Sequence, residues 1–156
     1  MVPRKIITAS LSGSLYPVLL GLIVPDIFGE GIDSLSDYFV SAISIVPIYM
    51  MYSFPAILVY GVLTSILSDK AGGFIAARTG EKKAEFIVSA ALHSVFGLVL
   101  LWFSLGAAVL FFITDRILKR FDKSYGWHHA FKSLAIPVLT WLLFMGFVWV
   151  WDLYFK

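Results

Sequence analysis

Residues 38–68 read YFVSAISIVPIYMMYSFPAILVYGVLTSILS, which is 31 consecutive residues without a charged side chain between Asp37 and Asp69. An α-helix rises about 1.5 Å per residue, so about 20 apolar residues are enough to cross the hydrocarbon core of a bilayer. The stretch is therefore long enough to cross a membrane and extend beyond it. Pro47 and Pro55 lie inside it. Because each proline removes a backbone donor, we expect this helix to be kinked.

Three further intervals lack charged residues: 6–25, 86–114 and 133–151. Of the 156 residues, 60% are hydrophobic and 14% are charged, against roughly 45–50% and about 25% in soluble domains. Only helices and closed barrels satisfy their backbone hydrogen bonds in lipid, and the run from Phe96 to Phe103 lacks the alternation of a barrel strand. The sequence predicts an all-α polytopic membrane protein, a single domain over residues 1–156 with four transmembrane helices.

The first apolar interval has a second interpretation. It follows Arg4 and Lys5, a pattern that also opens secretory signal peptides. Pro17 lies inside the run, and the residues after it offer no suitable small-x-small cleavage site. We therefore expect the interval to be retained as a span, whereas cleavage would leave three spans.

Residues 86–114 allow two arrangements, one long helix or a hairpin that turns near Ser104–Gly106. The hairpin would return the basic segment 115–132 to the face that carries the bases of residues 69–85, as the positive-inside rule favours. Each arm of about 14 residues would reach only about 21 Å as a helix, which is too short to cross the core. We therefore expect one long third helix.

Lysine and arginine counts predict the orientation. The N-terminal segment carries two bases, the loop at 26–37 carries four acidic residues and no base, and the loop at 69–85 carries four bases. The N-terminus is therefore expected in the cytoplasm, and four spans return the C-terminus to the same side. With one long third helix the balance is seven bases inside against five outside.

Small residues recur at every fourth position of the first span: Ala9, Gly13, Pro17 and Gly21. Residues at this spacing share one helix face, and small side chains let another backbone approach closely. Ala9, Gly13 and Gly21 are therefore a candidate helix-packing face. We expect it to contact another span of the same chain, and the alternative is a dimer of the GxxxG kind.

His93 is the ionisable residue that lies well inside a predicted span, and Ser89 precedes it by one helical turn. An ionisable residue within a membrane is a functional candidate by default, although one interhelical hydrogen bond can also satisfy a neutral histidine. We take His93 and Ser89 as a candidate polar site. No catalytic motif or cluster of metal ligands accompanies them, so no enzyme activity, cofactor or metal is expected.

Basic residues alternate with apolar ones after the third predicted span. The candidates for contact with anionic lipid are Arg116, Lys119, Arg120 and Lys123. Helical spacing separates these bases from their apolar neighbours, as in a segment that lies in the headgroup layer. The expected partners are the bilayer and its anionic phospholipid headgroups, with another membrane protein or a second copy of the chain, and no nucleic acid.

The stretch FPAILVYGVLTS at residues 54–65, followed by Ser68 and Asp69, carries a resemblance. Together with the four-span pattern it resembles an uncharacterised family of small multi-pass membrane proteins from Bacillus-type bacteria. The resemblance implies a bacterial cell membrane, and it implies no activity and no functional residue.

The sequence thus predicts a protein that works without catalytic chemistry. We expect an accessory, immunity or assembly protein that acts through helix–helix and lipid contacts. The alternative is a small homo-oligomeric transporter or channel that uses the kinked second span and His93.

Overall fold

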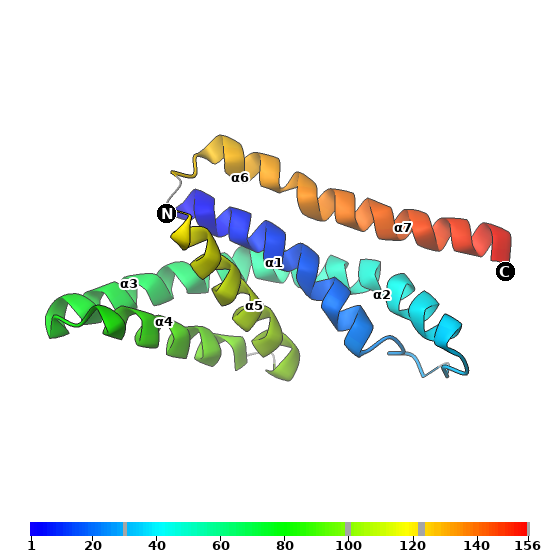
Figure 1. Ribbon diagram of the computed structural model, residues 1–156, viewed down its shortest axis with the longest axis horizontal. Coiled ribbons are helices and arrows are strands. Elements are labelled where there is room, and N and C mark those ends of the chain that lie inside the picture. The colour runs from blue at the N-terminus through cyan, green and yellow to red at the C-terminus, as the bar shows by residue number, and fades with distance from the viewer. Residues whose placement is uncertain (30, 99–100, 122–123, 156) are drawn as a thin grey trace.

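The computed structural model describes residues 1–29, 31–98, 101–121 and 124–155. In these ranges every element is helical (Figure 1). In chain order the elements are α1 (Val2–Ile23), α2 (Leu35–Ala56), the π-helical η1 (Ile57–Gly61), α3 (Val62–Thr79), α4 (Lys82–Gly97), α5 (Leu101–Arg120), α6 (Trp127–Ser133) and α7 (Ala135–Phe155). The predicted all-helical class is therefore confirmed.

Three helices in the described part of the chain are long and apolar enough to cross a membrane: Val2–Ile23, Leu35–Thr79 and Trp127–Phe155. They contain the predicted first, second and fourth spans almost completely. The N-terminus lies beside α6, and the C-terminus lies at the opposite end of the bundle (Figure 1). The three helices are compatible with a membrane protein, and their arrangement places the two termini at different ends.

The second of these helices is unusually long. It comprises α2, η1 and α3 without interruption, and its 45 residues correspond to about 68 Å of helix, about twice the thickness of a hydrocarbon core. The π-helical turn begins two residues after Pro55, where the α-helical hydrogen-bond ladder has lost a donor. The kink predicted from Pro47 and Pro55 stays a prediction. The π-helical turn is the irregular part of this helix at which a kink would be expected.

The expectation of one long helix over residues 86–114 is wrong. Helix α4 ends at Gly97 and α5 begins at Leu101, and the two pack against each other as a hairpin (Figure 1). Lys119 Nζ lies 2.8 Å from Glu85 Oε1, although 34 residues separate them. One continuous helix would hold those residues about 51 Å apart.

The physical reason lies in what covers the two arms. Their short length argued against a hairpin because neither arm can cross a bilayer by itself. In the structure α4 packs along α3, and α5 packs along α1. Because each short arm packs along a longer helix, its length does not have to match the thickness of a hydrocarbon core.

Small residues allow these helices to approach closely. A Cβ on Gly21 would lie 2.6 Å from the backbone oxygen of Ala42, and one on Gly13 would lie 2.7 Å from the ring of Phe54. Ala9 is fully buried. The small-residue face of α1 therefore contacts α2 of the same chain.

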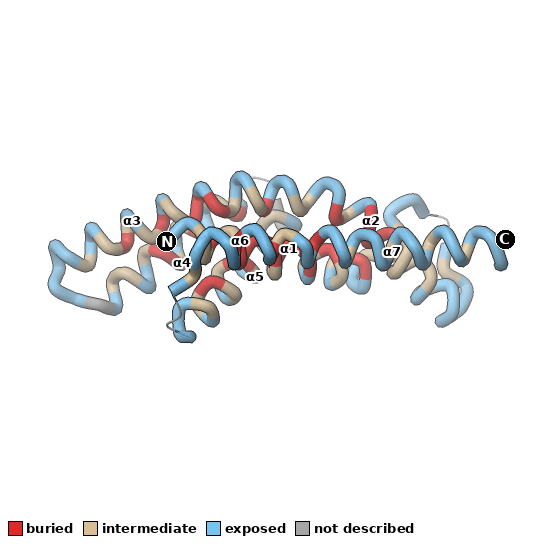
Figure 2. The backbone as a smooth tube through the Cα atoms, turned by 90° about the horizontal axis from the view of Figure 1, so that it is seen from above, coloured by how far each residue is buried: buried red, intermediate tan, exposed pale blue. Residues whose placement is uncertain are grey.

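Burial is unequal along the bundle (Figure 2). Helix α1 buries about half of its length, whereas α7 is exposed along nearly all of its length, with Pro137 as its buried residue among those described. Exposed apolar side chains on α7 include Leu139, Leu143 and Trp149. An apolar and uncovered helix of this kind is suited to contact with lipid.

Candidate functional site

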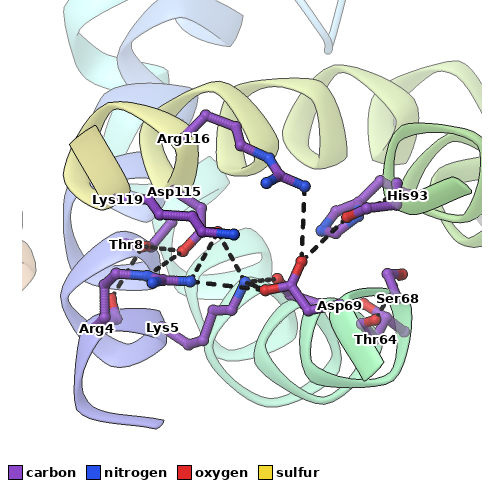
Figure 3. Close-up of polar contacts among 12 residues, drawn as sticks. Arg4, Lys5, Thr8, Thr64, Ser68, Asp69, His93, Asp115, Arg116 and Lys119 are labelled. Atoms are coloured by element: carbon purple, nitrogen blue, oxygen red, sulfur yellow. Dashed lines mark hydrogen bonds and ion pairs between the residues drawn. The ribbon is translucent and has the colours of Figure 1, made fainter. Parts of the chain in front are cut away.

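A cluster of buried charges lies where the start of α1 meets α3 and α5 (Figure 3). Lys5 is fully buried, and its Nζ lies 2.6 Å from Asp69 Oδ2 and 2.8 Å from Asp115 Oδ2. The same ammonium group donates a hydrogen bond of 2.7 Å to Ser65 Oγ. One lysine of α1 therefore links a carboxylate of α3 to a carboxylate of α5.

Two arginines complete this ion cluster, which comprises Arg4, Lys5, Asp69, Asp115 and Arg116. Arg4 Nε lies 3.0 Å from Asp115 Oδ1, and Arg4 also reaches Asp69 at 3.6 Å. Arg116 approaches Asp69 Oδ1 to 3.8 Å. Its guanidinium group also lies over the aromatic rings of Phe86 and Phe112, at 5.0–5.4 Å from their centroids.

The ion cluster is best explained as a clamp between helices. Buried charges are tolerated only when they are paired and hydrogen-bonded, and both carboxylates here have several partners. Since its members come from three separate helices, the cluster holds the hairpin against the start of α1.

The sequence did not indicate this cluster, because four of its members were interpreted as boundaries of apolar intervals and Arg116 as a lipid contact. Arg4 and Lys5 precede the first interval, Asp69 ends the second, and Asp115 ends the third. A single long helix would place Asp115 on the opposite membrane face from Asp69. The hairpin instead brings Asp115 close to Asp69, and Lys5 lies between the two. The signal in the sequence was the opposite charge of the residues that end three apolar intervals.

The predicted lipid-contact residues have different surroundings. Arg116 belongs to the ion cluster, and Lys119 forms an ion pair with Glu85, with exposed fractions of 44% and 34% for the two side chains. Arg120 is exposed, whereas Lys123 lies outside the described residues. Lys119 and Arg120 are therefore the exposed cations among the described candidates, and Lys119 is paired with Glu85.

Ser89 and His93 connect the ion cluster to the interior of the hairpin. Ser89 Oγ donates a hydrogen bond of 3.1 Å to Asp69 Oδ1. His93 Nδ1 lies 2.8 Å from the backbone oxygen of Ser89, and the imidazole packs against the rings of Phe111 and Phe112. Only 6% of His93 is exposed, and its Nε2 has no hydrogen-bond partner among the described residues.

His93 also forms part of the wall of a cavity of about 330 Å³. The cavity lies between the tip of the hairpin and helices α1, α2 and η1, and its surface is mostly apolar. Aromatic side chains dominate the wall, among them those of Tyr16, Tyr49, Tyr60, Phe96 and Phe111. Its size falls in the range of cavities that hold small molecules.

Tyrosine hydroxyls fix the shape of this cavity. Tyr16 donates to the backbone oxygen of Phe103 at 2.5 Å, and Tyr60 donates to that of Phe96 at 3.1 Å. Both carbonyls lie near the tip of the hairpin, so these bonds tie the tip to α1 and η1. The cavity is therefore built by contacts between helices and does not depend on one flexible loop.

Within the described ranges, no group of three or more histidine, aspartate or glutamate residues could hold a metal ion. No family model, characterised protein or solved structure matches this chain.

Proposed function

We propose that the chain is a non-catalytic accessory protein of the membrane, which binds a small amphipathic molecule from the lipid phase. The observation that carries this proposal is the aromatic cavity between the hairpin and the spanning helices. The cavity contains few polar groups, which suits capture of an apolar body better than chemistry on it. The ion cluster supports the same function because it anchors the hairpin that closes one side of the cavity.

Filling the cavity tests this proposal. Ala56 is an exposed residue that contributes to the cavity wall, so Ala56→Phe would place a ring in the cavity with little disturbance of the core. We expect a neutral small molecule to co-purify with the wild-type protein in lipid nanodiscs and to fall at least about tenfold in the Ala56→Phe variant, as expected when a ligand's space is taken. Mass spectrometry of organic extracts measures the bound amount.

The matched control is Ala77→Phe, which adds the same ring to an exposed position of α3 away from the cavity. This variant should retain the wild-type amount of bound molecule. Equal amounts in all three proteins, or a wild-type extract with nothing beyond bulk lipid, would contradict the proposed binding function.

For the topology, we propose three crossings and a hairpin that enters from the cytoplasmic side without crossing. The helices Val2–Ile23, Leu35–Thr79 and Trp127–Phe155 would make the crossings. This topology puts eleven of the twelve bases on the cytoplasmic side, in agreement with the positive-inside rule. It keeps the N-terminus in the cytoplasm and moves the C-terminus to the opposite face, which replaces the earlier expectation for that end.

Cysteine labelling tests the topology directly because the chain contains no cysteine. The single variants Val2→Cys, Arg120→Cys and Tyr154→Cys all alter exposed positions. In intact cells a membrane-impermeant maleimide should label only Tyr154→Cys, and lysis should expose the other two. Labelling of Arg120→Cys in intact cells would contradict the non-crossing hairpin.

The transporter alternative stays a second, untested prediction. The cavity lies within one chain, so binding does not require the homo-oligomer that the transporter alternative assumes.

A further inference from the structure

A second, smaller pocket adjoins the ion cluster and shares no residue with the aromatic cavity. Its volume is about 230 Å³, and its wall consists of Met1, Arg4, Asp69, Lys70, Glu85 and Lys119. Five of these six residues are charged, whereas the wall of the aromatic cavity contains no aspartate, glutamate, lysine or arginine. The second pocket is therefore suited to a small charged group.

The charges at this pocket do not cancel. The pocket and the adjoining ion cluster together contain the five cations Arg4, Lys5, Lys70, Arg116 and Lys119 and the three carboxylates Asp69, Glu85 and Asp115. Each carboxylate already has a lysine nitrogen within 2.6–2.8 Å. Two positive charges therefore remain uncompensated, which favours an anion as the ligand.

Three side chains of the wall can donate to such an anion. The side chain of Lys70 is exposed and forms no ion pair or hydrogen bond with any residue that the structure describes. Arg4 binds both oxygens of Asp115 through Nε and Nη2, and 18% of its side chain is still exposed. Lys119 donates to Glu85 and has further N–H donors on the same nitrogen. These cations come from α1, α3 and α5 and meet at one pocket.

Donors of this kind suit a phosphate group. A phosphate monoester has three strong acceptor oxygens and carries up to about two negative charges at neutral pH. Lysine and arginine bind such oxygens through charge-assisted hydrogen bonds, which are stronger than bonds between neutral groups. The number of oxygens and the charge both match what the wall offers.

The position of the pocket favours a lipid as the source of the phosphate. Arg4 precedes the uncharged interval 6–25, and Lys70 follows the uncharged interval 38–68. In the proposed topology these ends lie where the hydrocarbon core meets the headgroup layer, and basic pockets between helices at this depth bind lipid headgroups. The exposed side chain of Met1 adds an apolar edge to the wall, against which an acyl chain can lie.

We propose that this pocket binds the phosphate group of an anionic lipid, with Lys70 as its main donor and Arg4 and Lys119 as further donors. The inference goes beyond the proposed binding function because it assigns a second site with a different ligand. It also differs from the lipid contact predicted along α5, since Arg4 and Lys70 belong to α1 and α3 and Arg116 contacts Asp69. The carboxylate of Glu85 lies in the same wall and opposes the ligand.

Two lipids with the same acyl chains test this site: dioctanoyl phosphatidic acid, whose phosphate is terminal, and dioctanoyl phosphatidylcholine, whose phosphate carries a cationic choline. Each is titrated against the full chain in nonionic detergent micelles, and binding to empty micelles is subtracted. We expect the wild-type protein to bind phosphatidic acid at least about tenfold more tightly than phosphatidylcholine. Inorganic phosphate, titrated in the same way, should bind more weakly than phosphatidic acid because it has no acyl chain.

Single variants link the binding to the pocket. Lys70→Gln removes the unpaired cation and should weaken binding of phosphatidic acid about tenfold, as expected for one charge-assisted hydrogen bond. Glu85→Gln removes a carboxylate from the wall and releases Lys119, so phosphatidic acid should bind more tightly. The matched control is Lys83→Gln, which removes the same charge from an exposed position of α4 outside the pocket and should change binding by less than about twofold.

The outcomes separate the pocket from general attraction to a basic surface. Equal binding of the two lipids to the wild-type protein would overturn the phosphate site, and equal losses in Lys70→Gln and Lys83→Gln would overturn the pocket as its location. Inorganic phosphate that binds as tightly as phosphatidic acid would overturn the lipid as the source. Because the two sites share no residue, Ala56→Phe should retain binding of phosphatidic acid, so this inference and the proposed function can fail separately.

Discussion

Replacement of Lys5 with methionine is expected to lower the free energy of unfolding by about 3–5 kcal/mol, the effect of removing one partner from a buried ion pair. Lys5 is fully buried and is the cation closest to both Asp69 and Asp115. Methionine has a similar length and no charge, so Lys5→Met leaves two buried carboxylates with weaker pairing. Denaturant unfolding in detergent micelles measures the loss.

Two further variants make this result specific. Lys119→Met removes a lysine from a part-exposed pair with Glu85 on the same hairpin and should cost less than about 1 kcal/mol. In Lys5→Met, Asp115 keeps Arg4 as a partner at 3.0 Å, so adding Asp115→Asn also removes the nearest carboxylate of that arginine. The double variant should therefore be less stable than Lys5→Met alone. Equal losses for Lys5→Met and Lys119→Met would contradict the clamp.

Adjacent glycines in α3 are expected to respond to alanine with opposite signs. A Cβ on Gly72 would lie 2.8 Å from the backbone oxygen of Glu85, so α3 and α4 would have to move apart. Gly72→Ala should destabilise the protein by about 1–3 kcal/mol, as is usual for overpacking. A Cβ on Gly73 meets nothing within 4 Å, so Gly73→Ala should stabilise the helix by about 0.5–1 kcal/mol.

The glycine pair also tests the link between the hairpin and the cavity. Helix α4 carries His93 and Phe96 of the cavity wall, so its displacement in Gly72→Ala should lower the amount of co-purified small molecule, whereas Gly73→Ala should not. Thermal unfolding and mass spectrometry of organic extracts give the two measurements on the same samples. A change of the same sign and size in both variants would show that α3 and α4 do not approach as closely as the structure describes.

Part of the fold could be predicted from the sequence. Long intervals without charge indicate helices suited to a membrane, and the small-residue face of α1 follows from spacing alone. The charge distribution favoured the hairpin, but the length criterion argued against it because that criterion treats each segment as if it faced lipid. The criterion does not apply to residues 86–114, because their two helices pack against α3 and α1. Such contacts between distant segments cannot be read from a local sequence pattern.

The candidate site shows the same division. His93 and Ser89 could be singled out because an ionisable residue within an apolar run is unusual. The partners of His93 were not predictable, since Phe111 comes from the other arm of the hairpin. The ion cluster was misread for a related reason: Lys5, Asp69 and Asp115 were each assigned to a boundary, and only the folded hairpin brings the three boundaries together.

A helical chain suited to a membrane could be predicted from residue order alone, because hydropathy and charge act on each segment independently of the others. Three features became visible in the folded chain: two short helices pair with each other and pack against the longer ones, opposite charges from three helices meet, and aromatic side chains from five helical elements line one cavity. Those features depend on distances between residues far apart in the chain, and such distances are set by packing.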